Sequence, residues 1–191
     1  AHFNLAGDYE KQGDWAAAAQ SYHDALQLNA GDVEAWNGLG LSLQELQAFP
    51  EAESAWHQAL AVAPGNFNAN NNLGQLLDRT GRLGEAAHWL AAAQAAEPGS
   101  ALVLNNLGTN HQKRGQQLAA IDFYRQALAL QPDSAHTHAN LLFALNYHPD
   151  ASGEEIYEAY RAYDERFGRP QRVHWRAHEN VRDAKKKLKV G

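Results

Sequence analysis

The sequence predicts an all-α solenoid of stacked helix pairs, because leucine, alanine and turn-forming residues recur with one period. The leucines lie 34 residues apart, at Leu5, Leu39, Leu73, Leu107 and Leu141. Two alanine columns keep the same period, at Ala18, Ala52, Ala86 and Ala120 and at Ala25, Ala59, Ala93 and Ala127. Periods of about 20 to 50 residues are typical of units that bury their apolar faces only by stacking on one another.

Small and large residues are divided between the two helices of each predicted pair. Glycine follows the repeating leucine at Gly40, Gly74 and Gly108. A column of large residues lies three positions before the second alanine column, at Tyr22, Trp56, Leu90 and Tyr124. Antiparallel helices approach closely only where side chains are small. We therefore expect the glycines at the closest approach and the large side chains in the gaps between helices.

Glycine and proline mark the ends of the predicted helices. The mid-repeat turn, where a left-handed residue ends the first helix, has Gly13, Gly81 and Gly115, with Gln47 as the exception. Proline closes three units at Pro64, Pro98 and Pro132, and Ala30 closes the first. We expect helix pairs at about 2–12 and 15–28, 33–46 and 49–62, 67–80 and 83–96, and 101–114 and 117–130, with a fifth first helix at about 135–147.

This period and these columns resemble the tetratricopeptide repeat family across residues 1–147. The resemblance implies four full repeats and the first helix of a fifth. It also implies a right-handed superhelix whose concave face is lined by the first helix of each pair. Proteins or extended peptide segments are the partners expected of such a face.

The pattern changes in residues 148–168. Pro149 stops the fifth first helix, and Ser152 with Glu155 forms a capping box for a new helix at about 153–167. Gly168 and Pro170 are expected to end that helix. Large side chains recur on it at helical spacing and predict that it caps the open end of the solenoid, at Ile156, Tyr157, Tyr160, Tyr163 and Phe167. Residues 169–191 are expected to be a linker and the start of a truncated domain, with a strand beginning at Leu188.

The junction after the repeats carries a second resemblance. The stretch from Asn140 to Asp150, followed by Glu154, Glu155 and Ile156, is similar to the passage after the repeats in bacterial relatives of protein O-linked N-acetylglucosamine transferase. In that family a sequence similar to residues 178–191 introduces the glycosyltransferase region. The resemblance implies an arm that recruits substrates for a UDP-sugar-dependent transferase, with the catalytic residues beyond Gly191 and none in this chain. The alternative is a free-standing adaptor that assembles protein complexes, which needs only the repeats.

A stripe of asparagines directly precedes the repeating leucine, at Asn4, Asn72, Asn106 and Asn140, with Asn37 beside the interrupting Gly38. A second, partial column contains Asn71 and Asn105. Asparagine is a poor helix former, so its recurrence inside helices needs a reason. A carboxamide both donates and accepts, and so can bond the N–H and C=O groups of an extended peptide. The transferase resemblance implies this peptide-binding role. The alternatives are that the amides are solvated or bond to the neighbouring repeat.

Composition excludes several other classes of function. The net charge is −6, and an acidic body argues against nucleic acid as a ligand. Cysteine is absent, which excludes disulfides and thiolate chemistry. His174 and His178 have helical metal-pair spacing but no third ligand, so we expect no metal or other cofactor. Without an 18-residue apolar run or a secretory signal, we expect a cytoplasmic protein with no membrane partner. The sequence indicates no oligomeric state.

Overall fold

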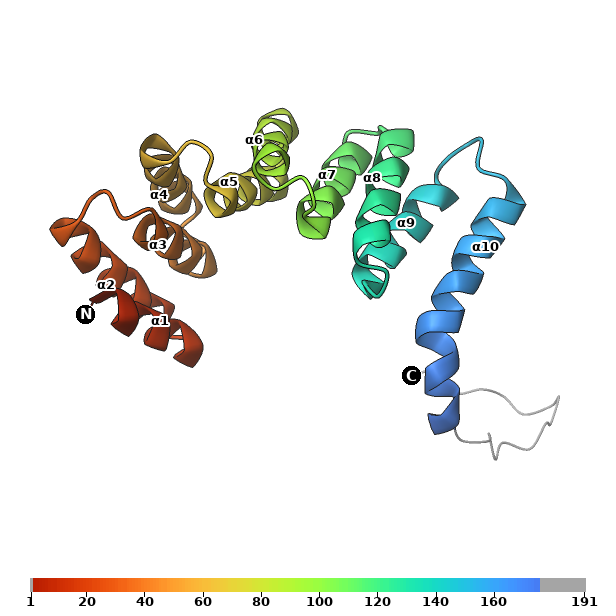
Figure 1. Ribbon diagram of the computed structural model, residues 1–191, viewed down its shortest axis with the longest axis horizontal. Helices are drawn as coiled ribbons and strands as arrows, with labels where there is room; N and C mark the ends of the chain where they lie inside the picture. Colours follow the sequence, from red (N-terminus) through yellow and green to blue (C-terminus); the bar gives the residue numbers. More distant parts are fainter. Residues whose placement is uncertain (1, 176–191) are drawn as a thin grey trace, which may run out of the picture.

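The computed structural model describes residues 2–175, which form an arch of stacked helices (Figure 1). The four helix pairs are α1 (His2–Gln12) and α2 (Trp15–Leu28), α3 (Val33–Glu45) and α4 (Phe49–Val62), α5 (Phe67–Arg79) and α6 (Leu83–Ala96), and α7 (Ala101–Lys113) and α8 (Gln117–Leu130). They are followed by α9 (Ala135–Asn146) and α10 (Gly153–Tyr163). The predicted all-α solenoid is confirmed. The strand expected at Leu188 lies outside the described residues.

The helices begin and end where local chemistry requires it. The side chains of Asp32, Asn66, Ser100 and Ser134 each accept a hydrogen bond from a backbone N–H in the first turn of α3, α5, α7 and α9. The mid-repeat turns have positive φ at Gly13, Gly81 and Gly115, as predicted. Gln47 has φ 61° at the same place, although it carries a Cβ.

The large side chains pack against the glycines of the partner helix. A Cβ on Gly40 would lie 2.5 Å from the indole nitrogen of Trp56, which is fully buried. A Cβ on Gly74 would lie 2.7 Å from Cγ of Leu90, and Gly108 has the same relation to Tyr124. These glycines are therefore required by close approach of the helices, as the sequence predicts.

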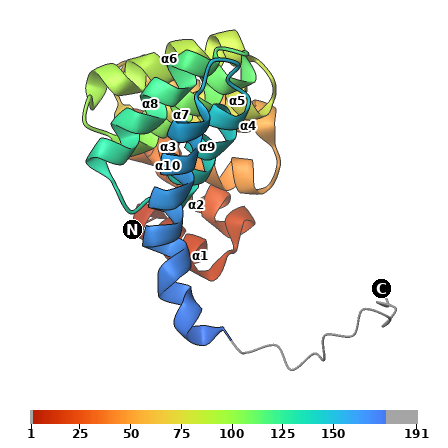
Figure 2. The same ribbon diagram turned by 90° about the vertical axis from the view of Figure 1, so that its right-hand side faces the viewer.

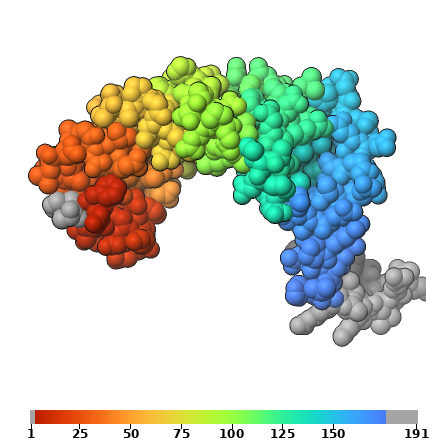
Figure 3. Space-filling view, viewed as in Figure 1, coloured from red at the N-terminus to blue at the C-terminus, as the bar shows by residue number. Residues whose placement is uncertain are grey.

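The arch curves because first helices lie closer together than second helices. Each first helix contacts the next one along the stack, α1 with α3, α3 with α5, α5 with α7 and α7 with α9. The second helices contact first helices on either side of them instead. Figure 1 shows α4 and α6 on the outer side of the arch, and Figure 3 shows the hollow beneath it. We call the concave surface of α1, α3, α5, α7 and α9 the inner face.

The C-terminal segment (Gly153–His174) leaves the line of the repeats and extends past them (Figure 2). Its helical run does not end at Gly168 and Pro170, as expected, but continues through a π turn at Asp164–Gly168 and a 3-10 helix at Arg169–His174. The wider turn lets the Arg169 N–H donate to the Asp164 carbonyl. Pro170 then lies in the first turn of the 3-10 helix, where its missing N–H leaves no bond unmade.

None of the described helices is both long and apolar enough to cross a bilayer.

Candidate functional site on the inner face

The asparagines of the inner face are joined in pairs between successive repeats. The Asn106 amide nitrogen (Nδ2) donates to Oδ1 of Asn71 over 2.9 Å, and Nδ2 of Asn140 donates to Oδ1 of Asn105 over 3.0 Å. The acceptors are buried and the donors are half-buried. Bonding to the neighbouring repeat, one of the alternatives raised by the sequence, is therefore what one end of these amides does.

The other end of each pair stays open to the concave side. Within residues 2–175, Oδ1 of Asn106 and Oδ1 of Asn140 accept no hydrogen bond from the chain, and neither atom is buried. Asn105 Nδ2 likewise has no partner in the described chain. Because Nδ2 of Asn106 and of Asn140 is held by the preceding repeat, the orientation of each free carbonyl is fixed before any ligand arrives.

The other predicted asparagines are placed differently. Asn72 is half-buried, and its Oδ1 accepts from Asn71 Nδ2 at 3.3 Å. Asn37 is buried, donates to Oδ1 of Asn66 at 3.1 Å and leaves its own Oδ1 without a partner. Asn4 is exposed. Asn37, Asn106 and Asn140 thus each donate to an asparagine of a neighbouring repeat, but only Asn106 and Asn140 keep an unbonded Oδ1 that is not buried.

Gly38 interrupts the asparagine column because a side chain of the first repeat fills the space beside it. Ala6 stands where the later repeats have glycine, and the Tyr22 ring lies against Gly38 of the next helix. Any side chain at position 38 would overlap that ring. Phe3 also packs on Tyr22, with ring centroids 5.6 Å apart in an edge-to-face arrangement. An aromatic contact thus replaces the amide pair between the first two repeats.

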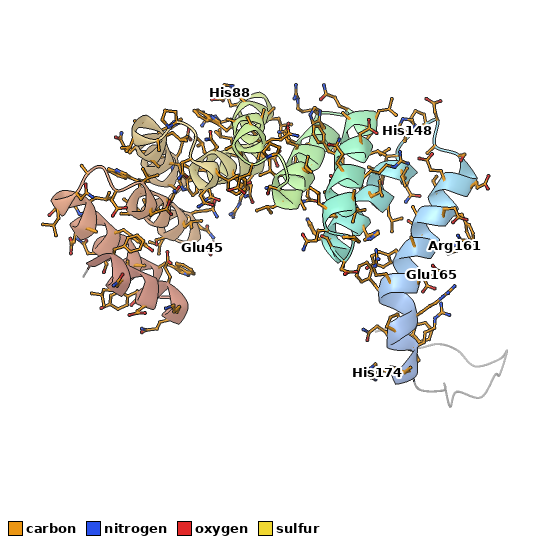
Figure 4. All side chains as sticks on the ribbon, in the orientation of Figure 1. Glu45, His88, His148, Arg161, Glu165 and His174 are labelled. Atoms are coloured by element: carbon orange, nitrogen blue, oxygen red, sulfur yellow. The ribbon has the colours of Figure 1, made fainter. Side chains whose placement is uncertain are left out.

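Two hollows lie along the inner face. One, of about 290 Å³, is lined mainly by polar side chains of α5, α7 and α9, including Gln75, Asn106, Thr109 and His136. The other, of about 350 Å³, lies between α1, α3, α5 and α7 and includes Asn37, Asn71 and Asn72. Figure 4 shows side chains along the whole concave side of the arch. Asn37, Asn72 and Asn106 therefore border open space that a ligand could enter, whereas Asn4 and Asn140 line neither hollow.

Two tyrosine hydroxyls near the hollows have raised pKa values. Burial, with the nearby Glu10 carboxylate, raises the pKa of Tyr22 to about 12, and burial also raises the pKa of Tyr124. Both phenols therefore stay protonated at neutral pH. In residues 2–175 no three His, Asp or Glu side chains converge to hold a metal, and His178 lies outside the described residues.

Sequence reasoning missed a column of polar residues that fastens the loops between repeats. The side chains of Trp36, Asn70 and His138 hydrogen-bond the carbonyl oxygens of Ala30, Pro64 and Pro132, respectively, over 2.9 to 3.0 Å. The repeat spacing was the available signal, since Asn70 lies one period after Trp36 and His138 two periods after Asn70, with Leu104 interrupting the column. The column is hard to recognise in the sequence because three different residue types bond the equivalent carbonyl of each loop.

Comparison with known proteins gives one family and one recurring fold. Sequence models of the tetratricopeptide repeat match residues 3–56, 40–101 and 100–131. No curated protein matches the chain.

Solved structures of MamA have the same fold. A double mutant of MamA RS-1 is 22% identical with a TM-score of 0.81, covering 90% of this chain and 95% of that one. MamA from residue 41 to its end, from Desulfovibrio magneticus RS-1, is 19% identical with a TM-score of 0.76, covering 90% and 94%. Another MamA crystal structure is 16% identical with a TM-score of 0.77, covering 94% and 96%.

The family models together span more than half of the chain, from Phe3 to Gln131, and the helix pairs, glycine contacts and turns keep the same period across that span. Repeats of this kind are scaffolds that bind proteins or peptides. The chain belongs to the tetratricopeptide repeat family.

Proposed function

We propose that the inner face binds an extended segment of another protein and holds its main chain with asparagine amides. The observation that carries this proposal is the pairing of amides between repeats. Each pair uses one end to join two repeats and leaves the donor residue's Oδ1 unbonded. Asn106 lines a hollow of the inner face, and Asn140 follows it one repeat further along. An open carbonyl at successive repeats suits a ligand whose donors also recur, which a polypeptide main chain provides.

The free groups match both kinds of main-chain atom. Oδ1 of Asn106 and of Asn140 can accept from peptide N–H groups, and Nδ2 of Asn105 can donate to a peptide carbonyl. Ordering a flexible segment costs free energy, whereas the amides are already held by their neighbours. Binding of moderate affinity and little dependence on side-chain identity is expected from these contacts alone.

The decisive variant is Asn106→Ala with Asn140→Ala, tested against peptides selected from a random dodecapeptide library on the wild-type chain. We expect binding to weaken by about fivefold to 150-fold, because two main-chain hydrogen bonds are lost at about 0.5–1.5 kcal/mol each. Isothermal titration calorimetry measures the affinity, and circular dichroism checks that the helices remain.

The matched control is Asn110→Ala. Asn110 is fully buried and also bridges repeats, donating to Asp78 Oδ1 and to the Leu83 carbonyl, each over 3.0 Å, but it lines neither hollow. The Asn110→Ala variant therefore measures how the loss of hydrogen bonds between repeats affects binding when no contact with the ligand is removed. Replacing single amides of the peptide by esters should weaken binding to the wild type and have less effect on the double variant. Equal affinities of wild type and double variant would refute main-chain binding by these amides.

The finer hypothesis is that this scaffold recruits substrates for an O-linked sugar transferase. It rests on the similarity of residues 140–156 to the junction that follows the repeats in that family. Here that stretch forms the end of α9, a turn in which the Asp150 N–H donates to His148 Nδ1 over 3.1 Å, and the start of α10.

The test is to incubate the native protein with UDP-N-acetylglucosamine and a peptide that binds the inner face, and to measure sugar transfer by mass spectrometry. Sugar transfer that decreases when Asn106 and Asn140 are replaced supports the hypothesis that the scaffold recruits substrates for a transferase. Absence of transfer favours the adaptor that assembles protein complexes, a function that needs only the repeats.

A further inference from the structure

The two hollows of the inner face differ in chemistry. The hollow near the N-terminal end is bordered by large apolar side chains, of which Phe3, Leu41 and Leu102 are 40%, 38% and 53% exposed. Phe67 adds a half-buried ring. At the position of Leu41, the two following repeats have Gln75 and Thr109, which line the other hollow. At this position the inner face therefore changes from apolar to polar along the stack.

Charge changes in the same direction. The first helices α1 and α3 carry four carboxylates and one lysine, a net charge of −3. Glu10 and Glu34 line the apolar hollow, and no lysine or arginine lines it. Helices α5, α7 and α9 carry Asp78, Arg79 and Lys113, a net charge of +1 with neutral histidines. Carboxylates beside exposed apolar surface attract a cation and an apolar group together.

We propose that the hollow lined by Phe3, Leu41, Leu102, Glu10 and Glu34 is a side-chain site for a large apolar residue next to a lysine or arginine of the bound segment. This inference rests on the proposed function, since it adds side-chain selection to main-chain binding. The apolar side chain lies against Leu41 and Leu102, and the cation lies between the two carboxylates. Because only this end of the face carries the site, the site fixes the position of that residue pair along the stack.

The hollow is suited to this occupant in size and in contacts. Its volume of about 350 Å³ accommodates one large side chain and part of another, not a folded element. Exposed apolar side chains in such a group lose unfavourable contact with water when an apolar group covers them. The aromatic contact between Phe3 and Tyr22 occupies the place of an amide pair, so no amide pair joins the first two repeats and side-chain contacts matter more at that end of the hollow.

The experiment selects dodecapeptides from a random library on the full chain and on four variants, two of which are controls. We expect the wild type to enrich a large apolar residue adjacent to Lys or Arg, and Glu10→Gln with Glu34→Gln to lose the basic preference. A labelled consensus peptide should bind that double variant about threefold to tenfold more weakly, and the difference should shrink at high salt. Leu41→Gln should remove the apolar preference.

The control variants lie outside the inner face. Glu51→Gln with Glu97→Gln removes the same charge from exposed sites, and Leu118→Gln removes an apolar side chain that is 66% exposed on α8. Both should select the wild-type consensus. The side-chain site is overturned if the wild type selects peptides without that consensus, or if the Glu10 and Glu34 variant binds the consensus peptide as tightly as the wild type does. In either case the Asn106 and Asn140 variant should still lose binding. If that asparagine variant also binds normally, main-chain binding fails with it.

Discussion

Each second helix of the repeats buries a large side chain against a glycine of a neighbouring first helix, whereas the C-terminal segment buries none. Trp56, Leu90 and Tyr124 are fully buried against glycines. One period after Tyr124 the chain has Glu158, which forms an ion pair with Arg161 at the surface. One period after Gly108 it has Leu142. Both halves of the contact are thus changed together, and no residue of the C-terminal segment is buried.

The C-terminal segment is held instead by half-buried apolar residues and by polar contacts. Ile156 and Ala159 pack on the cluster that contains Ile121 and Leu145. Arg166 donates to the Pro132 carbonyl over 2.8 Å, and Phe167 packs edge-to-face on His138 with ring centroids 5.5 Å apart. The comparison teaches that the glycine and large-residue columns act as a unit. Where both are lost, the chain stays helical but binds its neighbour less closely.

The largest expected effect comes from removing the large side chain of a repeat. Trp56→Ala should lower the free energy of unfolding by about 3–5 kcal/mol, because it empties a fully buried site next to Gly40. Ile156→Ala in α10 should cost only about 1 kcal/mol, because that side chain is half-buried. Urea unfolding followed by circular dichroism measures both. Similar losses for the two variants would contradict the proposed difference between the regions.

A smaller effect is expected at the anchor of the C-terminal segment. Arg166→Ala removes the bond to the Pro132 carbonyl and a 2.9 Å ion pair with Asp133. Both groups of the ion pair are well exposed, so the expected loss is about 0.5–1 kcal/mol, confined to residues 164–174. Hydrogen exchange with mass spectrometry should show several-fold faster exchange there and no change in α1–α8.

Arg161→Ala is the matched control for this experiment, since its ion pair with Glu158 lies within α10. Exchange of residues 164–174 should be unaffected by it. If Arg166→Ala instead lowers the stability of the whole chain, the C-terminal segment unfolds together with the repeats and the comparison fails.

Most of the fold could be predicted because its signals are local and repeated. The ends of the nine helices in the repeats lie within one residue of the predicted ends, since capping side chains and left-handed turns fix them. The end of the C-terminal helical run could not be predicted in this way. Gly168 and Pro170 signal a stop, but a π turn and a 3-10 turn absorb them. Whether the helical run stops or continues there depends on contacts between side chains, such as the ion pair between Arg172 and Asp164 at 2.7 Å.

The candidate site was predicted in part. The 34-residue spacing placed the asparagines on one side of the stack, because spacing determines which helix face a residue occupies. Which amide atom bonds to which neighbour depends on the distance between helices in different repeats. The pairing of Asn106 with Asn71 therefore required the structure. The hollow around Leu41 was also missed. Its lining comes from five helices, and the residue type changes from repeat to repeat at positions such as Glu34, Asn68 and Leu102, although their 34-residue spacing is kept.

The smallest expected effect tests an irregularity inside the regular region. Gln47 holds a positive φ of 61° where the other full repeats have glycine. A left-handed conformation costs a residue with a Cβ about 1–2 kcal/mol, and glycine avoids that cost but loses more backbone entropy on folding. Gln47→Gly should therefore stabilise the chain by about 0.5–1 kcal/mol, measured as a higher urea midpoint with an unchanged slope. The reverse change, Gly81→Ala at φ 84°, should destabilise it, and no Cβ contact would account for that loss because nothing lies within 4 Å. A gain from Gln47→Gly would show that the repeats retain strain at a turn and that uniform packing does not require uniform turns.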